Sequence, residues 1–416
     1  MRTAKRRNGT GAIDWVRVAV VGAGPAGLAA SRALADAGCR HVVLERKRIG
    51  WSWRTQRWDS FRLNTPVWMN RVPGEYLAGA PATFATADAL LAGLERFADG
   101  LPVFEGVEVL RAEPVGPVWR LETSRSTIVA AAVVVASGFQ NVPRRPDYAA
   151  ELPTGVDQLH VADYRRPEDL AGAVLVVGGA QSGLQIAEDL LDGGHRVYLS
   201  TSRVGRLPRH YRGRDAFEWM QATGQLDLPS EQAEPAAIAA TPPQVSGAAG
   251  GRTVSYQHLA KRGVTLLGRT IGWDGTRLEL AADLGSNLRF ADEVSNAFRG
   301  AWDKHAVLES GELVPADDRD PADEPAADLY TARGPASLDL AAEGISTVIW
   351  ATGFDASTGW LPAGALDERG HPQVRGLHVI GAPWLTHRSS PNLYGMTADA
   401  ERLAGEFASA GLRAVA

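Results

Sequence analysis

The chain has 416 residues, enough for two or three domains, and its 45% hydrophobic and 22% charged residues are an ordinary globular balance. A net charge of -5 and a pI near 6.0 argue against nucleic acid or an anionic membrane as a general partner, and no apolar run is long enough to cross a bilayer. The single cysteine, Cys39, excludes an internal disulfide and a paired-cysteine redox centre, and the histidines lack metal-ligand spacing. We therefore expect a soluble, cytoplasmic protein without a metal.

A strand–helix–strand unit follows a predicted flexible basic tail over residues 1–14. The apolar run 16–21 predicts a buried parallel strand, residues 25–38 a small-residue helix, and residues 41–45 a second strand. The turn between the first strand and the helix reads VVGAGPAG, residues 20–27, which is the glycine pattern of a dinucleotide-binding turn.

Each glycine of this first turn has a physical task. Gly22 permits the tight turn, Gly24 lets a pyrophosphate approach the backbone, and Gly27 lets the helix pack against the strand. The start of the helix supplies amide donors for the phosphates. Glu45, at the end of the second strand, is the carboxylate expected on the ribose hydroxyls.

A second unit of the same kind begins with a predicted strand at 173–177, followed by a helix and a strand at 195–200. Its turn, VVGGAQSG at 176–183, keeps Gly178 and Gly183 but has Ala180 in the middle position. A methyl group there tightens the approach of a phosphate without blocking it.

The residues after the two units differ more than the turns do. Where the first unit ends in Glu45, the second continues with Thr201, Ser202 and Arg203. A carboxylate repels a 2′-phosphate, whereas hydroxyls and an arginine bind one. The first unit therefore suits the ribose of FAD or NAD, and the second suits NADPH. Arg203 could instead be a solvated surface residue, and the same two interpretations apply to nearby Arg206, Arg209, Arg212 and Arg214.

The domain organisation predicted from these units is one domain inserted into another. The fold class is α/β with two Rossmann-like domains: an FAD-binding domain of residues 15–146 and 342–416, and an NADPH-binding domain of residues 147–341. Two buried runs ending in ASGF and ATGF are expected to bring backbone close to a ligand. Residues 233–251 and 313–328 are predicted to be long loops.

The chain resembles the flavin-containing monooxygenases through an ordered set of motifs: VVGAGPAG, GWSWRTQRWDSFRLNTP, ASGF, LHVADYR, VVGGAQSG and VIWATGF. The likeness is greatest to bacterial single-chain flavoproteins described as involved in K+ transport, and it extends from about residue 16 to the C-terminus. It implies that NADPH reduces FAD, that oxygen adds at the flavin C4a atom, and that the (hydro)peroxyflavin transfers one oxygen atom to a small organic substrate.

The resemblance also implies particular site residues. Asn64 matches an asparagine beside the flavin ring and is the candidate catalytic residue, although an asparagine before Thr65-Pro66 is also a common turn former. Trp53 and Arg54 match a segment that runs along the flavin. The complete set of predicted cofactor contacts is Gly22, Gly24, Pro25, Ala26, Gly27, Glu45, Arg46, Trp53, Arg54, Asn64, Gly178, Gln181, Ser182, Gly183, Thr201, Ser202, Arg203, Gly353, Asn392 and Leu393.

The sequence departs from the family at its usual fingerprint, FxGxxxHxxxW. Here LPTGVDQLHVADY lacks the Phe, has one extra residue before His160 and ends in Tyr164, which weakens a Baeyer–Villiger assignment. His160 is interpreted either as an interdomain linker residue or as a buried histidine satisfied by backbone. Trp384, His387 and Tyr394 suit an aromatic substrate pocket or packing around the flavin.

Oxygenation at nitrogen, sulfur or an aromatic carbon is therefore the favoured activity, with molecular oxygen and a small molecule as partners, the latter aromatic if the predicted aromatic pocket binds it. Baeyer–Villiger oxidation or oxidative decarboxylation of a carbonyl substrate is the alternative, because plant indole-3-pyruvate monooxygenases share the RLNTP-like segment. A reductase or oxidase without substrate oxygenation, and a non-catalytic nucleotide sensor, are further alternatives. No feature of the sequence predicts an oligomeric state.

Overall fold

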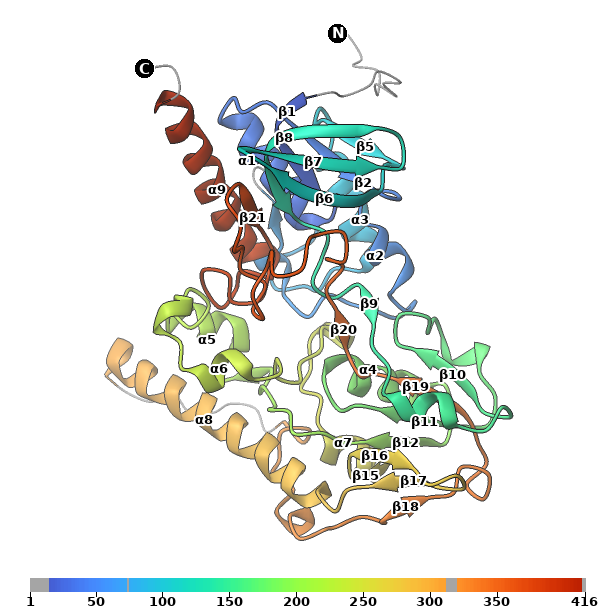
Figure 1. Cartoon of the computed structure of the whole chain (residues 1–416). Coiled ribbons are helices and arrows are strands. Elements are labelled where there is room, and N and C mark those ends of the chain that lie inside the picture. Colours follow the sequence, from blue (N-terminus) through green and yellow to red (C-terminus); the bar gives the residue numbers. More distant parts are fainter. Residues whose placement is uncertain (1–14, 73–74, 312–319, 414–416) are drawn as a thin grey trace.

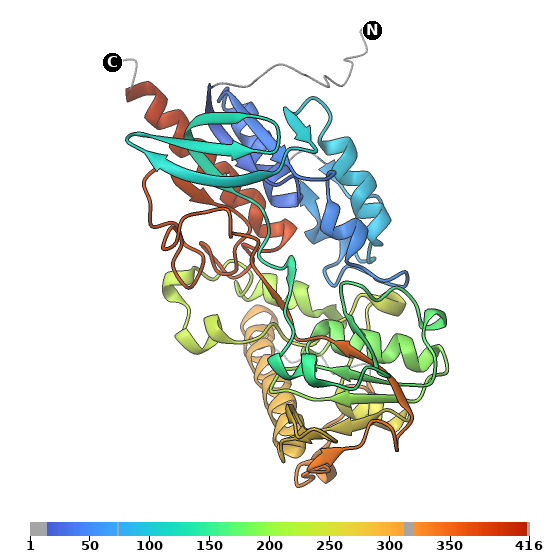
Figure 2. The same cartoon turned by 45° about the vertical axis from the view of Figure 1, so that its right-hand side comes forward.

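A computed structural model of the chain describes residues 15–72, 75–311 and 320–413. Two α/β units lie one above the other in Figure 1, the upper one built from both ends of the chain and the lower one from its middle. Figure 2, turned by 45°, shows the same division. The predicted tail, residues 1–14, and residues 313–319 of the predicted loop at 313–328 lie outside the described residues.

The upper unit, hereafter the first unit, contains a seven-stranded sheet of order β5-β2-β1-β8-β7-β6, with β21 pairing β8. Its strands are β1 Trp15–Val21, β2 His41–Glu45, β5 Val103–Glu105, β6 Val109–Val115, β7 Val118–Thr123, β8 Thr127–Val135 and β21 Leu377–Val379. Helices α1 Pro25–Asp36, α3 Ala87–Phe97 and α9 Leu393–Arg413 pack together with one face of this sheet. The short elements are α2 Trp51–Thr55, β3 Arg71–Val72 and β4 Glu75–Tyr76.

Strand β1 shows why the sheet is buried on both faces. Val18 and Val20 belong to the core shared with α1, α3 and α9, whereas Ala19 and Val21 belong to the core on the opposite face. Successive side chains of a strand point to opposite faces, so a continuous apolar run is what a doubly covered strand requires.

The lower, second unit contains a parallel five-stranded sheet of order β10-β19-β11-β12-β15. Its strands are β10 Asp157–His160, β11 Ala173–Val177, β12 Val197–Ser200, β15 Thr265–Leu267 and β19 Ile345–Trp350. Helices α4 Gln181–Asp192 and α7 Tyr256–Lys261 pack against it through a shared apolar cluster. A small antiparallel sheet of β16 Thr270–Trp273, β17 Leu278–Leu280 and β18 Ser337–Leu338 lies beside it.

A helical insertion lies between β12 and β18 in the chain. It contains the hairpin β13 His210–Tyr211 with β14 Arg214–Asp215, and the helices α5 Ala216–Ala222, α6 Pro235–Ala239 and α8 Leu284–Ser310. Residues 233–251, predicted to be a loop, contain the short helix α6. Trp219 and Trp302 stack at the centre of an apolar cluster that also includes Met69 of the first unit. The insertion therefore joins the two units as well as extending one of them.

Two antiparallel crossings connect the units. Strand β9 Val142–Pro143 leads into the second unit and pairs with β20 Phe354–Asp355, which leads out of it. The predicted boundary at residue 342 is wrong for β19, because this strand pairs with β10 and β11 in the second sheet. A buried apolar run fits either parallel sheet, so its composition could not identify its partners.

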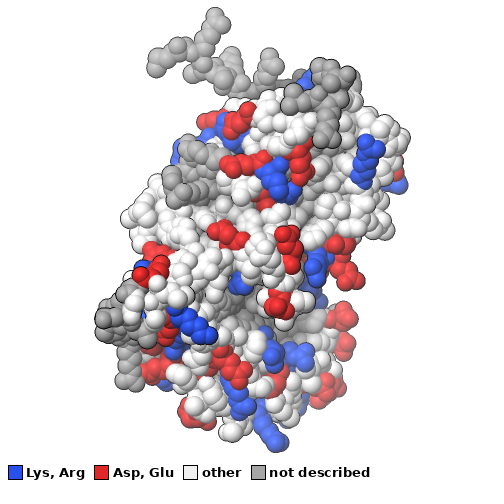
Figure 3. Space-filling view, turned by 90° about the vertical axis from the view of Figure 1, so that its left-hand side faces the viewer, with Lys and Arg blue, Asp and Glu red and all other residues white. Residues whose placement is uncertain are grey.

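The surface carries both signs of charge. On the face shown in Figure 3, Lys and Arg side chains alternate with Asp and Glu side chains over both units, so that this face presents no field of a single sign. Among the described helices, none is both long and apolar enough to span a membrane.

Candidate functional site: two dinucleotide turns facing an interdomain contact

The first turn has the geometry that a bound pyrophosphate requires. Gly22 has a φ of 108°, and a Cβ added to it would lie 2.4 Å from the Ala136 carbonyl oxygen. A Cβ on Gly27 would lie 1.9 Å from the Gly22 carbonyl oxygen. Both positions therefore admit only glycine, whereas a Cβ on Gly24 would meet no atom within 4 Å. The backbone at Gly24 is thus open to a ligand.

The helix that follows leaves its amides available. Helix α1 has Gly24 as its N-cap, with no side-chain cap and no acidic residue in its first turn. Glu45 is buried, and its carboxylate accepts hydrogen bonds from the backbone N–H groups of Ala23 and Lys47, both at 2.8 Å. The acidic group is thereby fixed beside the turn. This arrangement fits an adenine dinucleotide with an unmodified ribose.

The second turn has nearly the same backbone geometry as the first. Gly178 has a φ of 117°, and its Cβ would lie 2.4 Å from the Ala351 carbonyl oxygen. A Cβ on Gly183 would lie 1.8 Å from the Gly178 carbonyl oxygen. Ala180, the N-cap of α4, has φ -81° and ψ -169°, close to the -77° and -176° of Gly24. This is extended backbone that alanine adopts without strain, which explains why the middle glycine is dispensable.

The equivalent of Glu45 differs in chemistry. The Gly179 N–H donates to the Ser202 hydroxyl at 3.2 Å, in the place where Ala23 donates to a carboxylate. The buried Tyr256 hydroxyl contacts the turn: its single hydrogen is shared between the carbonyls of Gly179 and Ser202, at 3.0 and 2.9 Å, and its oxygen accepts from the Ser202 N–H at 3.1 Å. Burial raises the pKa of Tyr256 to about 12, so it remains a neutral donor. The second turn therefore has a neutral polar lining where the first has a negative one.

Arg203 is exposed, with its guanidinium carbon 4.1 Å from the centroid of the Phe290 ring. It has no carboxylate partner among the described residues, which leaves its charge available to an anion. Thr201, by contrast, is not positioned to bind a ligand as predicted. Its side chain is fully buried, donating to the Leu267 carbonyl at 2.7 Å and accepting from Asn287.

The other candidate arginines each pair with a carboxylate. Arg206 is buried in ion pairs with Asp292 and Asp323, and Arg209 is buried against Asp215. Arg212 pairs with Asp303, and Arg214 pairs with Glu309. The interpretation that Arg206, Arg209 and Arg212 assist nucleotide binding is therefore wrong, because each guanidinium already faces a carboxylate inside the insertion. Arg214 and Glu309 are both exposed, so Arg214 fits the alternative of a solvated surface residue.

Asn64 lies where the first unit touches the second nucleotide turn. Its Nδ2 donates to Gln181 Oε1 at 2.9 Å, and its Oδ1 accepts from Gln185 Nε2 at 2.9 Å. Both glutamines belong to α4, the helix that begins at Ala180. The Asn64 carbonyl accepts from Arg209 Nη1 at 2.7 Å. The side chain is thus a contact between units, beyond the turn-forming role that Thr65-Pro66 would explain.

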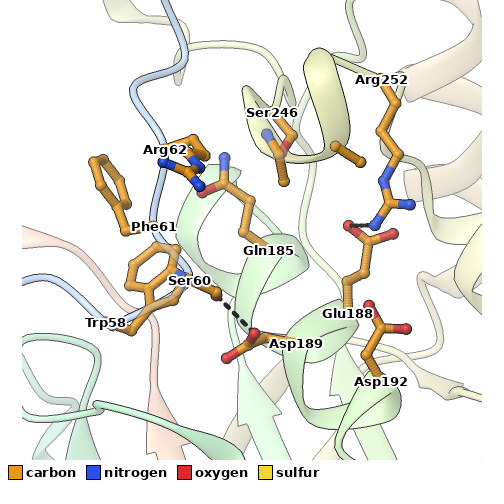
Figure 4. A pocket seen from close by; sticks show the side chains of 12 residues that line it. Trp58, Ser60, Phe61, Arg62, Gln185, Glu188, Asp189, Asp192, Ser246 and Arg252 are labelled. Carbon is orange, nitrogen blue, oxygen red and sulfur yellow. Dashed lines mark hydrogen bonds and ion pairs between the residues drawn. The ribbon is translucent and has the colours of Figure 1, made fainter. Parts of the chain in front are cut away.

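A cleft of about 310 Å³ opens next to this contact. Trp58, Ser60, Phe61 and Arg62 line it from the first unit, and Figure 4 shows them facing Gln185, Glu188, Asp189 and Asp192 of α4. The Ser60 hydroxyl donates to Asp189 across the cleft at 2.7 Å, and Arg252 pairs with Glu188 at 2.8 Å. Gln185 therefore both lines the cleft and contacts Asn64.

The remaining predicted cofactor contacts lie partly in the two turns and partly in other segments of the chain. Pro25, Ala26 and Ser182 are in the first turns of α1 and α4, and Arg46 is exposed directly after Glu45. Arg54 donates to the Ile49 carbonyl and to Glu95, and Trp53 packs edge-on to Phe61. Asn392 precedes α9, in which Leu393 is a core residue.

Gly353 and His160 lie together at the outward crossing. Gly353 has a φ of 88°, and its carbonyl accepts from His160 Nε2 at 3.0 Å. The Ala162 N–H donates to His160 Nδ1, so one ring nitrogen donates and the other accepts, which defines a neutral imidazole. Burial lowers the pKa of His160 in agreement. His160 is fully buried and satisfied by backbone, which is the second of its two predicted interpretations.

Sequence patterns gave no signal for Gln244 and Tyr256, which contact Gly179 in the second turn, or for Gln185, which contacts Asn64. Gln244 is fully buried, and its Nε2 donates to the Gly179 carbonyl at 2.8 Å. Gln185 lies four residues after Gln181, on the same face of α4. Only that helical spacing could have suggested its position. Among the described residues, no cluster of three or more potential metal ligands is present.

Comparison with known proteins agrees with this architecture. Residues 19–213 match the family model for pyridine nucleotide-disulphide oxidoreductases. A CzcO-like uncharacterized oxidoreductase of Geobacillus kaustophilus is 28% identical, over 94% of this chain and 98% of that protein. The indole-3-pyruvate monooxygenase YUCCA1 of Oryza sativa subsp. japonica is 32% identical, over 49% of this chain and 52% of that protein. The solved flavin-containing monooxygenase of Stenotrophomonas maltophilia superposes with a TM-score of 0.63 at 19% identity, covering 96% of this chain and all of that one.

Two nucleotide turns on two Rossmann-like units define a pyridine-nucleotide-linked flavoprotein oxidoreductase. Disulphide reduction through a cysteine pair in the chain is excluded, because Cys39 is the only cysteine and it is buried. Within this class the chain is similar to the flavin-containing monooxygenases, over half of its sequence to YUCCA1 and in its fold to the Stenotrophomonas maltophilia enzyme, and FAD and NADPH are the cofactors that the two turns and these relatives indicate.

Proposed function

We propose that the chain is an NADPH-dependent monooxygenase that inserts one atom of molecular oxygen at nitrogen, sulfur or an electron-rich aromatic carbon of a small organic molecule. The other oxygen atom leaves as water, and NADPH supplies the two electrons. The contact between Asn64 and α4 carries this proposal, because it joins the first unit to the helix that begins at the second turn.

The two turns divide the cofactors between them. Gly24 and the free amides of α1 bind the pyrophosphate of FAD, and Glu45 binds its ribose hydroxyls. The equivalent amides of α4 bind the pyrophosphate of NADPH, while Ser202 and Arg203 bind its 2′-phosphate. When bound, FAD supplies the redox and oxygen chemistry that no side chain of the chain can supply.

Asn64 is proposed to act at the reacting end of these cofactors. One of its two Nδ2 hydrogens is used by Gln181, and the other has no acceptor among the described residues. A fixed amide donor of this kind can hydrogen-bond an oxygen atom at the site and keep its proton in place.

Oxidative decarboxylation of a 2-oxo acid is a second candidate. It is favoured by the 32% identity to an indole-3-pyruvate monooxygenase over about half the chain. In the cleft beside Asn64 the rings of Trp58 and Phe61 suit an aromatic group of such a substrate, whereas the carboxylates of Glu188, Asp189 and Asp192 outnumber Arg62 and Arg252 and oppose a second carboxylate.

Stoichiometry tests the proposal. The purified yellow protein is given limiting NADPH, oxygen and in turn a panel of amines, thioethers, phenols and 2-oxo acids. Hydrogen peroxide and oxygenated product are both counted per NADPH. We expect at least one class of compound to lower the peroxide yield well below one per NADPH while product appears. A yield of one peroxide per NADPH across the whole panel contradicts oxygenation and identifies an oxidase.

A further inference from the structure

A pair of glutamines on α4 holds the Asn64 side chain from both ends. Gln181 Oε1 accepts from Asn64 Nδ2, and Gln185 Nε2 donates to Asn64 Oδ1, each at 2.9 Å. An asparagine amide can be turned over, which exchanges its donor for its acceptor. These two contacts allow one orientation only, because Gln181 offers an acceptor to the Asn64 NH2 group and Gln185 offers a donor to the Asn64 oxygen.

Each glutamine is itself fixed by a backbone carbonyl of one segment of the insertion. Gln181 Nε2 donates to the Pro243 carbonyl at 2.9 Å, and Gln185 Nε2 donates to the Val245 carbonyl at 2.7 Å. Between these two residues, Gln244 points its amide to Gly179 in the nucleotide turn. Residues 243–245 therefore connect the second turn to both glutamines.

The Gln185 side chain is buried, with 8% of its surface exposed. A buried amide is costly unless it is hydrogen-bonded, so its two bonds are retained as long as the units stay together. The main chain on either side of Asn64 is also held: a Cβ on Gly247 would lie 2.0 Å from the Leu63 carbonyl, and Arg209 binds the Asn64 carbonyl.

We infer that Gln185 is a positioning residue for oxygen transfer. It donates a hydrogen bond to the Asn64 oxygen and so fixes the side-chain amide with its remaining Nδ2 hydrogen toward the reacting oxygen. The inference rests on the proposed function. It makes the orientation of a first-unit side chain depend on the helix that binds NADPH. Gln181 completes the pair, but it lies at the first position of α4, where a change would also disturb nucleotide binding.

Gln185→Met tests this role, because it keeps length and helix propensity while removing both hydrogen bonds. Gln221→Met, an exposed glutamine on α5, is the matched control. We expect Gln185→Met to raise the peroxide yield per NADPH at least threefold with a coupled substrate. The anaerobic rate of flavin reduction by NADPH should stay within about twofold of the parent. The control should change neither value.

The double variant with Asn64→Ala separates positioning from independent damage. If Gln185 acts through Asn64, the double variant leaks as much peroxide as Asn64→Ala alone. Additive leakage overturns the inference, as does an unchanged peroxide yield in Gln185→Met.

Hydrogen exchange in the cofactor-free protein provides a readout independent of activity. We expect Gln185→Met to speed exchange of residues 62–66 and 243–247 at least tenfold, and Gln221→Met to leave it unchanged. Faster exchange without a change in peroxide yield assigns Gln185 a structural role only and overturns the inference. A parent enzyme that makes only peroxide overturns the proposed function itself, a result distinct from failure of the Gln185 variant in a coupled parent.

Discussion

The two nucleotide turns of this molecule share a backbone but differ in the group that faces the ribose. Gly22 and Gly178 have nearly the same φ, and both lie against the carbonyl of an alanine that ends a neighbouring strand, Ala136 or Ala351. Glu45 accepts the first turn's amide, and Ser202 accepts the second's. We propose that the glycine pattern provides for a dinucleotide and that the polar group at or just after the end of the next strand selects which one binds.

Replacing the first glycine of each turn should have the largest effect. Gly22→Val and Gly178→Val place the same side chain in the same left-handed backbone, 2.4 Å from a carbonyl oxygen in both cases. We expect Gly22→Val to purify without yellow colour. Gly178→Val should keep FAD and lose at least a hundredfold in the rate of reduction by NADPH, as absorbance and stopped-flow measurements will show. The reverse pattern would exchange the assignments of the turns.

Removing the charge at the second turn should have an effect of about one order of magnitude. Arg203→Ala is expected to lower the preference for NADPH over NADH, as the ratio of kcat/KM values, by roughly tenfold, the loss of one charged hydrogen bond. Arg214→Ala, which removes an arginine paired with Glu309, serves as the control. An unchanged ratio in Arg203→Ala would remove this residue from the site.

The turns that follow β8 and β19 contact different side chains, and the pH dependence of the unfolding free energy should show the difference. Gly353 is held by the neutral His160, whereas Gly138 is next to Asn141. Because burial lowers the pKa of His160, its stabilising effect is present above pH 6.5 and is lost as pH falls through the folded-state pKa. The unfolding free energy should therefore fall between pH 7.5 and 5.5, by about 1.4 kcal/mol per unit of pKa depression.

His160→Gln isolates that contribution, since glutamine keeps a donor for the Gly353 carbonyl but does not titrate. Denaturant unfolding of this variant should show a shallower loss of stability on acidification than the parent. Equal slopes would mean that the other histidines with lowered pKa values, among them His41 and His378, account for the acid sensitivity.

The middle position should matter least. Ala180→Gly gives the second turn the residue that the first turn has, at a backbone conformation that both residues adopt. We expect the KM for NADPH to change by less than about threefold. A tenfold fall in KM would show that the Ala180 methyl, rather than the Ser202 hydroxyl and the Arg203 charge, sets the affinity of this turn.

Local patterns predicted the parts of the fold that local physics determines. The strands at 41–45 and 173–177 and both glycine turns follow from apolar runs and from glycine sterics within a few residues. The sheet to which β19 belongs could not be predicted, since its partners are distant in the chain. The burial of Thr201 could not be predicted either, because its hydrogen-bond partners Leu267 and Asn287 are 66 and 86 residues away in the chain.

The candidate site divides in the same way. Asn64 could be proposed from a motif, whereas Gln185 and Gln244 belong to no motif and reach the site only through the packing of α4 against residues 243–245. Hydrogen bonds between residues so far apart in sequence leave no periodic signal.

Anaerobic reduction of the flavin tests the central claim, that the first turn holds FAD and the second receives NADPH. The yellow protein is mixed with equal, subsaturating concentrations of NADPH or NADH, and the loss of flavin absorbance is followed by stopped flow. We expect NADPH to bleach the flavin at least tenfold faster than NADH. Equal rates with the two nucleotides, or a protein that takes up no FAD, would contradict it.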